Sequence, residues 1–104
     1  MIIHTVLMKL KKEADETLKK EYIENIKNNV TEMKNNISAI SELELGAYDD
    51  TVPFASYDLI LNIRFKDADS YKTYMCHPLH AKAHDYATLV SESLAGITYS
   101  NFLV

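Results

Sequence analysis

Hydrophobic and polar positions change their spacing several times along this chain of 104 residues. Residues 2–10 are short, rich in branched side chains and bounded by charged residues, which predicts a strand with two largely apolar faces. From residue 14 to residue 36, apolar residues recur every three or four positions, as in an amphipathic helix. Residues 40–48 alternate apolar residues with Glu42 and Glu44, which predicts an edge strand with one polar face.

The rest of the chain predicts a loop, a strand, a broken helix and a final strand. Residues 49–56 contain a proline and paired aspartates, which suit an exposed turn. Residues 57–65 have apolar or aromatic side chains at every odd position, so we expect this face to lie under helices. Asp67 is expected to cap a short helix, with Ser70 as the less favoured start, and the last strand is expected over residues 97–104. Another helix is expected to end near Gly96, with an apolar stripe of Leu79, Ala83, Tyr86, Val90 and Leu94.

The segment from Tyr71 to His84 concentrates the residues that carry chemistry, including three of the four histidines. Pro78 cannot donate a backbone hydrogen bond, and it biases His77 toward an extended conformation. One helix is therefore expected to stop near His77, and another to begin with Pro78 in its first turn. This break places His80 close to Tyr74 at the end of the preceding helix. If the protein has a chemical site, we expect it here.

The order of these elements predicts an α+β fold, namely a ferredoxin-like βαββαβ plait in one domain of residues 1–104. Right-handed connections place the helices on one face of a four-stranded antiparallel sheet. The opposite face keeps an apolar patch to which Ile3, Leu7, Ile60 and Phe102 are expected to contribute. Because large exposed apolar patches usually mark interfaces, we expect a symmetric homodimer with the two sheets packed face to face.

Composition limits the classes of partner. A formal net charge of -4 argues against nucleic acid, because neutralising phosphates requires a basic face. The single cysteine allows no intramolecular disulfide, which fits a reducing compartment. The first residues lack the pattern of a signal peptide, and no run approaches the roughly 20 apolar residues that span a bilayer. We therefore expect a cytoplasmic protein without a nucleic acid or membrane partner.

The spacing Tyr74-x-x-His77-Pro78-x-His80 ahead of a terminal strand resembles the stress-responsive A/B barrel (Dabb) domain. The opening strand with its early histidine, His4, matches as well, and the resemblance covers essentially the whole chain. It implies a ferredoxin-like fold that dimerises through its sheets into an α+β barrel. Most members have no defined activity and are described by stress induction. Some plant members are polyketide cyclases that need neither cofactor nor metal, and cofactor-free monooxygenases are more distantly related.

Resemblance to the cyclases implies a role for three side chains around a cavity between sheet and helices. His80 matches the histidine that acts as the general base. Tyr74 matches the tyrosine that donates a hydrogen bond to a carbonyl or enolate oxygen. His4 matches a cavity-facing histidine on the first strand. The resemblance thus implies that His80 and Tyr74 are catalytic and that His4 contacts the ligand.

Two positions depart from the cyclase pattern. The cyclases carry an aspartate on the last strand that orients the catalytic histidine, where this chain has Asn101. They also carry a histidine two residues after the first tyrosine of the third strand, Tyr57, where this chain has Leu59. A neutral amide raises the basicity of a histidine less than a carboxylate does. The match of positions predicts that the ligand is contacted by Tyr57, Leu59 and Asn101. The two substitutions leave the cyclase pattern itself incomplete.

Each of these residues also fits a purely structural role. His80 lies at the boundary of the buried helix face, where a histidine can bond the backbone near the helix break. Tyr74 and His4 equally fit core residues whose polar atoms find partners. His80 and His84 have the i, i+4 spacing of two metal ligands, but the helical wheel turns His84 toward solvent and no HExxH pattern is present. We therefore expect no metal and no cofactor.

Three functions remain after this comparison. The favoured one is a homodimer of undefined activity that binds a small hydrophobic or phenolic ligand. The alternative is a cofactor-free enzyme, similar to a polyketide cyclase or a lyase, that uses His80 and Tyr74. A cofactor-free monooxygenase is third, because no residue pattern points to oxygen chemistry. If side chains fill the space between Tyr74 and His80, the enzyme hypothesis fails.

Overall fold

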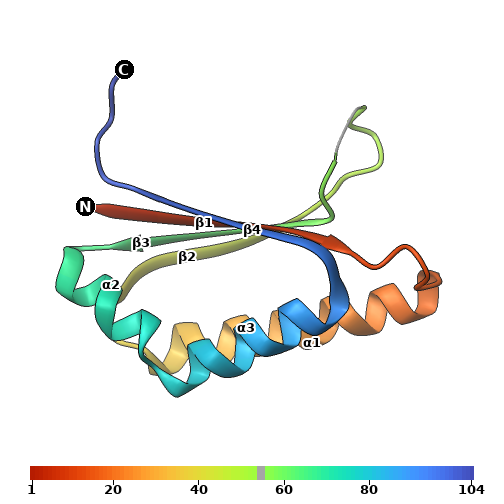
Figure 1. The fold of residues 1–104 in the computed structure, drawn as a ribbon, viewed down its shortest axis with the longest axis horizontal. Helices are drawn as coiled ribbons and strands as arrows, with labels where there is room; N and C mark the ends of the chain where they lie inside the picture. The colour runs from red at the N-terminus through yellow and green to blue at the C-terminus, as the bar shows by residue number, and fades with distance from the viewer. Residues whose placement is uncertain (54–55) are drawn as a thin grey trace.

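The computed structural model describes residues 1–53 and 56–104 and shows a four-stranded antiparallel sheet with helices on one face (Figure 1). Its elements are β1 (Ile2–Leu10), α1 (Glu16–Asn36), β2 (Ile40–Ala47), β3 (Leu59–Phe65), α2 (Ala68–Met75), α3 (Pro78–Val90) and β4 (Ser91–Tyr99). The strand order is β2-β3-β1-β4, so β1 and β3 are central and β2 lies at an edge, as predicted. The predicted ferredoxin-like plait is confirmed. Within the predicted loop, Phe54 and Ala55 lie outside the described residues.

The capping residues set the helix boundaries. Asp15 accepts a hydrogen bond from the backbone N–H of Leu18, so α1 begins at Glu16, slightly after the first apolar residue of its stripe. Asp67 caps α2 in the same way by accepting from the backbone N–H of Ser70, which confirms the predicted start of this helix. Among the described residues, no helix has the length and apolar character needed to cross a bilayer.

The break between α2 and α3 also lies where the sequence predicts it. Helix α2 ends at Met75 with Cys76 as its C-cap, and the Nδ1 atom of His77 accepts a hydrogen bond of 3.1 Å from the backbone N–H of Leu79. Pro78 occupies the first turn of α3, where its missing N–H leaves no intrahelical bond unmade. The chain therefore turns sharply at this point, and α3 runs beside α1 under the sheet (Figure 1).

The predicted boundary between the last helix and the last strand is wrong. Helix α3 ends at Val90, and β4 begins at Ser91 and pairs with β1 until Tyr99 lies opposite Ile3. Leu94 fits both the helical and the strand period, and in the strand it lies opposite Met8 on the face toward the helices. Residues 100–104 are outside the strand, and the chain leaves the sheet on the face away from the helices (Figure 1).

The core lies between the sheet and the helices. The odd positions of β3 are buried under the helices as predicted, and Ile63 and Phe65 have no exposed surface. The even positions of β1 lie on the same face, because Met8 pairs with Leu59. This face of the sheet therefore forms one wall of the core, and α1 and α3 form the other.

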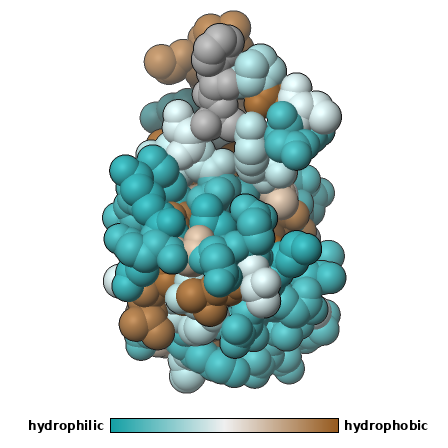
Figure 2. All heavy atoms as spheres, turned by 90° about the vertical axis from the view of Figure 1, so that its right-hand side faces the viewer, coloured by the Kyte–Doolittle hydropathy of each residue, from teal (hydrophilic) through white to brown (hydrophobic). Residues whose placement is uncertain are grey.

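The opposite side of the sheet is uncovered, and we call it the open sheet face. It carries exposed or half-buried apolar side chains, but the predicted Ile3 is only 5% exposed because Arg64 and Tyr99 flank it in the neighbouring strands. Phe102 lies beyond β4, where its ring contacts that of Tyr99. By contrast, the end of the molecule that carries the start of α1 is largely hydrophilic (Figure 2). The open sheet face comprises Leu7, Ile60, Ala95, Ile97 and Tyr99.

Candidate functional site

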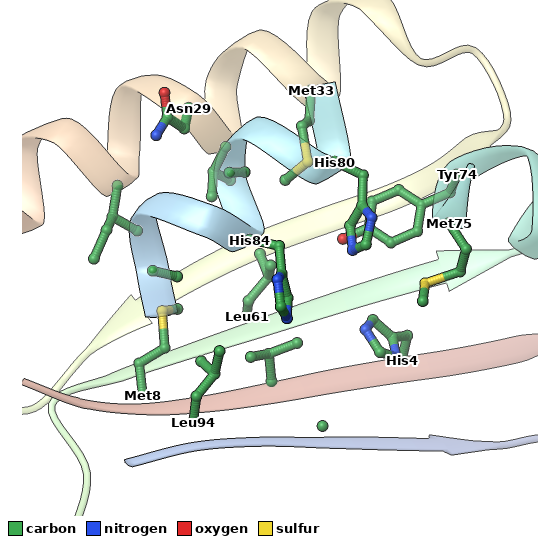
Figure 3. A pocket seen from close by; sticks show the side chains of 16 residues that line it. His4, Met8, Asn29, Met33, Leu61, Tyr74, Met75, His80, His84 and Leu94 are labelled. Carbon is green, nitrogen blue, oxygen red and sulfur yellow. The ribbon is translucent and has the colours of Figure 1, made fainter. Parts of the chain in front are cut away.

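A cavity of about 390 Å³ lies between the helix-facing side of the sheet and the helices α1 and α3 (Figure 3). Its walls are mainly apolar, with branched side chains and three methionines. A few polar side chains enter it, and these come from β1, α1, α2 and α3. We call this cavity the pocket. Its polar lining residues are His4, Asn29, Tyr74, His80 and His84.

The helix break positions the two residues predicted to carry chemistry. Tyr74 lies near the end of α2 and His80 in the first turn of α3, and their ring centroids are 4.6 Å apart. His4 reaches the same pocket from β1, with its ring centroid 6.0 Å from that of Tyr74 (Figure 3). The structure thus brings together three residues that the sequence singled out, and the pocket reaches both Tyr74 and His80. The enzyme hypothesis required that side chains leave this space open, and the pocket meets that requirement.

Tyr74 is buried, yet its hydroxyl makes no hydrogen bond within the described part of the chain. The residue is 2% exposed, and Figure 3 shows its oxygen pointing into the pocket beside His80. Burial raises the pKa of Tyr74, so the phenol stays protonated at neutral pH. The hydroxyl therefore presents an O–H donor to whatever enters the pocket.

His4 and His80 are held in the neutral form. Burial is the main cause that lowers the pKa of His80, and the neighbouring His84 lowers it further. A hydrogen bond with the Met75 backbone acts in the opposite direction and raises it. Burial also lowers the pKa of His4, and His80 contributes to this shift. A neutral imidazole offers one N–H donor and one lone pair. The pocket therefore contains groups that can donate a hydrogen bond and groups that can accept a proton.

Three predicted ligand contacts do not lie at this pocket. Leu59 lies in the core at the start of β3 and is 2% exposed, and Tyr57 precedes that strand. Both are separated from the pocket's His4, which pairs with Ile63 further along β3. Asn101 is exposed and lies beyond β4, so its placement on the last strand was wrong. The predicted strand of residues 97–104 extended past Tyr99, where β4 ends. Any ligand role of these residues stays a prediction.

The sequence reading missed Asn29, which lines the pocket from α1, and Thr98, and it misplaced His84. Thr98 on β4 lies opposite His4, and its Oγ1 atom is 2.7 Å from His4 Nδ1. His84, which the helical wheel turned toward solvent, is exposed but also lines the pocket. Alternation from Leu94 through Gly96 to Thr98 was the available signal for Thr98, once these residues are placed in a strand.

The histidines do not form a metal centre of familiar type within residues 1–53 and 56–104. No group of three or more metal-ligating His, Cys, Asp or Glu side chains occurs there. The rings of His80 and His84 have centroids 5.9 Å apart and are tilted by 42°.

The lowered pKa values of His4 and His80 predict acid sensitivity. In the unfolded chain both imidazoles bind protons below their ordinary pKa of about 6.5, whereas the folded protein resists protonation until lower pH. The unfolded state therefore binds more protons, and the free energy of unfolding is expected to fall as the pH is lowered from 8 through 6.5. Urea unfolding at fixed protein concentration measures this slope.

The control is a variant that carries both His4→Gln and His80→Gln, and it should show a clearly shallower slope between pH 8 and 5.5. The carboxyl groups of Asp49 and Asp67 also have lowered pKa values, but they titrate below about pH 4 and do not interfere. An unchanged slope in the double variant would show that these two histidines are not held neutral.

Comparisons with known proteins place the chain among structures of the same fold. The model of the family described as "Stress responsive A/B Barrel Domain" matches residues 2–100. No curated protein matches the chain in sequence. A dimeric protein of unknown function with a ferredoxin-like fold from Bacteroides fragilis is 26% identical, and the alignment covers 96% of this chain and 95% of that one with a TM-score of 0.84.

Two further solved structures share the fold at lower identity. A Dabb family protein from Mesorhizobium loti is 24% identical, with 97% of this chain and 96% of that one covered and a TM-score of 0.72. A hydroxynitrile lyase from Passiflora edulis is 13% identical, with 99% of this chain and 94% of that one covered and a TM-score of 0.80. At these identities the likeness concerns the fold alone.

Proposed function

Because this chain belongs to the stress-responsive A/B barrel (Dabb) domain family, we propose that it is a homodimer whose pocket binds a small, mainly apolar molecule. The polar end of this ligand accepts a hydrogen bond from the Tyr74 hydroxyl, beside His80. The family includes proteins of undefined activity and fixes no single reaction, so the proposal depends on the pocket. The observation that carries it is the hydroxyl of Tyr74, which has no hydrogen-bond partner in the described residues and points into a cavity of about 390 Å³.

The size and lining of the pocket support binding. Small-molecule sites are typically clefts of about 300–1,000 Å³, with mainly apolar walls and a few polar groups that orient the ligand. The pocket has this composition, with the polar groups His4, Tyr74 and His80 gathered at one end (Figure 3). A hydrophobic or phenolic ligand would cover the apolar walls and give the Tyr74 hydroxyl the acceptor that it lacks.

The open sheet face supports the homodimer. Ile97 is 53% exposed and Ile60 is 37% exposed, although both lie in strands. A second copy of the sheet would cover these side chains, and the Bacteroides fragilis protein of the same fold is described as dimeric. The proposal includes no nucleic acid or membrane partner, because it uses only the pocket and the open sheet face. It also includes a location in the cytoplasm.

A cofactor-free lyase or cyclase is the second candidate function. It is favoured by the contact between the rings of Tyr74 and His80, which sets a neutral base beside a phenolic donor. The fold is shared with a hydroxynitrile lyase, although at 13% identity. Among the residues that line the pocket there is no carboxylate to orient His80, so binding is placed first. No residue of the pocket points to a monooxygenase.

Tyr74→Phe tests whether the hydroxyl serves a ligand or the fold. Because the hydroxyl has no partner in the described residues, its removal should leave the free energy of unfolding unchanged or slightly higher. The affinity for the bound molecule should fall roughly three- to ten-fold, the value of one hydrogen bond. The ligand is first identified by native mass spectrometry of protein purified without denaturant, and its affinity is then measured by calorimetry.

Tyr22→Phe is the matched control, because Tyr22 is half-buried against the core but does not line the pocket. A clear loss of stability in Tyr74→Phe would instead show a structural tyrosine. His80→Ala separates the two candidate functions. An enzyme should lose turnover on the order of 100-fold, whereas a binding protein should keep most of its affinity.

A further inference from the structure

A chain of hydrogen bonds joins His4 to two hydroxyl groups at the edge of the pocket. Thr98 on β4 lies opposite His4 on β1, and its Oγ1 atom is 2.7 Å from His4 Nδ1. The same Oγ1 atom is 3.2 Å from the hydroxyl oxygen of Tyr71 on α2. We call this arrangement the Tyr71–Thr98–His4 relay.

The chemistry of the three groups sets the direction of the relay. The Thr98 hydroxyl has a single proton, so it donates either to His4 or to Tyr71. A phenol is a stronger donor and a weaker acceptor than an aliphatic hydroxyl, because the ring withdraws its lone pair. The distance of 2.7 Å to His4 is also typical of an O–H donor, since N–H donors prefer about 2.9–3.0 Å. Tyr71 therefore donates to Thr98, and Thr98 donates to His4 Nδ1.

The direction of the relay fixes the tautomer of His4. A neutral imidazole whose Nδ1 accepts a hydrogen bond carries its proton on Nε2. His4 is only 8% exposed, and burial lowers its pKa, so the ring is neutral. Its Nε2 has no hydrogen-bond partner within the described residues, and the ring lines the pocket on the side opposite α3 (Figure 3). His4 thus presents an N–H donor to the pocket, as Tyr74 presents an O–H donor.

We infer that Thr98 and Tyr71 hold His4 as an Nε2–H donor toward the pocket, and that the pocket therefore prefers apolar ligands with an acceptor oxygen such as a carbonyl. This inference rests on the proposed function of the pocket. Thr98 and Tyr71 are positioning residues, because they act through His4 and do not line the pocket. Two donors at the polar end select an oxygen that accepts, and an isosteric methylene group leaves both unsatisfied.

The tautomer is measured without any ligand, by long-range proton–nitrogen NMR of protein with ¹⁵N-labelled histidine. The expected result for the unmodified protein is a His4 ring protonated on Nε2 alone. Thr98→Val removes the donor while keeping the side-chain shape, and it should give a mixture of tautomers. Thr98→Ser should restore the single form. Because Thr98 is exposed on an edge strand and valine favours strands, the variant should fold. Tyr71→Phe is the second variant, with the same direction and a smaller effect.

Ligand preference is measured with two probes of equal shape, acetophenone and α-methylstyrene, which differ by a carbonyl oxygen and a methylene group. The unmodified protein should bind acetophenone at least about ten-fold more tightly. Thr98→Val should weaken acetophenone binding about three- to ten-fold and leave α-methylstyrene unchanged, and Thr98→Ser should restore it.

Three results would overturn the inference. A His4 ring protonated on Nδ1 would reverse the relay. An unchanged tautomer in both Thr98→Val and Tyr71→Phe would show that neither residue positions the ring. Equal affinity for the two probes would refute the preference for an acceptor oxygen. If the unmodified protein binds neither probe while His4 is protonated on Nε2, the relay stands, but the proposed pocket function and the ligand preference that depends on it both fail.

Discussion

Replacing Phe65 by alanine is expected to lower the free energy of unfolding by about 3–5 kcal/mol, the usual cost of removing a buried phenylalanine ring. Phe65 ends β3, has no exposed surface, and lies where β1 and β2 both pair with this strand. Since small domains are stable by only about 5–15 kcal/mol, the variant should lose a large part of its stability. Urea unfolding measures the change, at one protein concentration because assembly adds to apparent stability.

The position of the ring explains why the surroundings should not collapse into the void. Phe65 packs against the rings of Tyr71 and Tyr74, with centroids 5.5 Å and 5.1 Å away. These tyrosines belong to α2, which is held at its start by the Asp67 cap and at its end by the turn into α3. A cavity that cannot close costs more than the transfer of the ring to water. The same void would loosen Tyr74, so ligand binding should weaken as well.

Two further variants make the result specific. Phe65→Leu keeps most of the buried volume and should cost clearly less, roughly 1–2 kcal/mol. Leu89→Ala removes an apolar side chain that is 65% exposed on α3, and should change stability by no more than about 0.5 kcal/mol. A loss below about 1 kcal/mol for Phe65→Ala would contradict the described core.

The elements that the sequence predicts correctly are those whose signals are local. The Asp67 cap, the stop before Pro78 and the odd face of the third strand all depend on residues close together in the chain. The end of α3 was predicted wrongly because Leu94 satisfies two periods at once, and Gly96 can either end a helix or occupy a strand. Only the pairing of β4 with β1 decides between them, and that pairing is a long-range contact.

The same distinction applies to the site. Tyr74 and His80 were found because the helix break that joins them lies in one short segment. Thr98 was missed because its role depends on the register that places it opposite His4, which is 94 residues away. Asn101 was chosen instead because it matches the aspartate on the last strand of the cyclases, but the predicted strand of residues 97–104 extended past Tyr99, where β4 ends. Local patterns therefore gave the half of the site on α2 and α3, and the family resemblance gave His4 on β1, while Thr98 on β4 required the register of the sheet.

Replacing Ile97 by glutamate is expected to convert the protein from a dimer to a monomer. Ile97 lies on the open sheet face with 53% of its surface exposed, and it is opposite Thr5 in the central strand β1. A two-fold axis between the sheets would place the new carboxylate in the interface twice, where desolvation of each charge costs several kcal/mol. The dissociation constant should therefore rise at least about 100-fold, which corresponds to about 2.7 kcal/mol.

Sedimentation velocity over a range of protein concentrations measures this change. Leu89→Glu is the matched control, because Leu89 is equally apolar and similarly exposed but lies on α3, on the helix side of the sheet. It should leave the dimer intact, since a charge there stays in water. If Ile97→Glu remains a dimer while Leu89→Glu dissociates, the copies meet through their helices. If the unmodified protein is a monomer at tens of micromolar, the apolar residues of the open sheet face have another role. The expected pattern, dissociation in Ile97→Glu alone, would establish that the exposed isoleucines of this sheet hold two copies together.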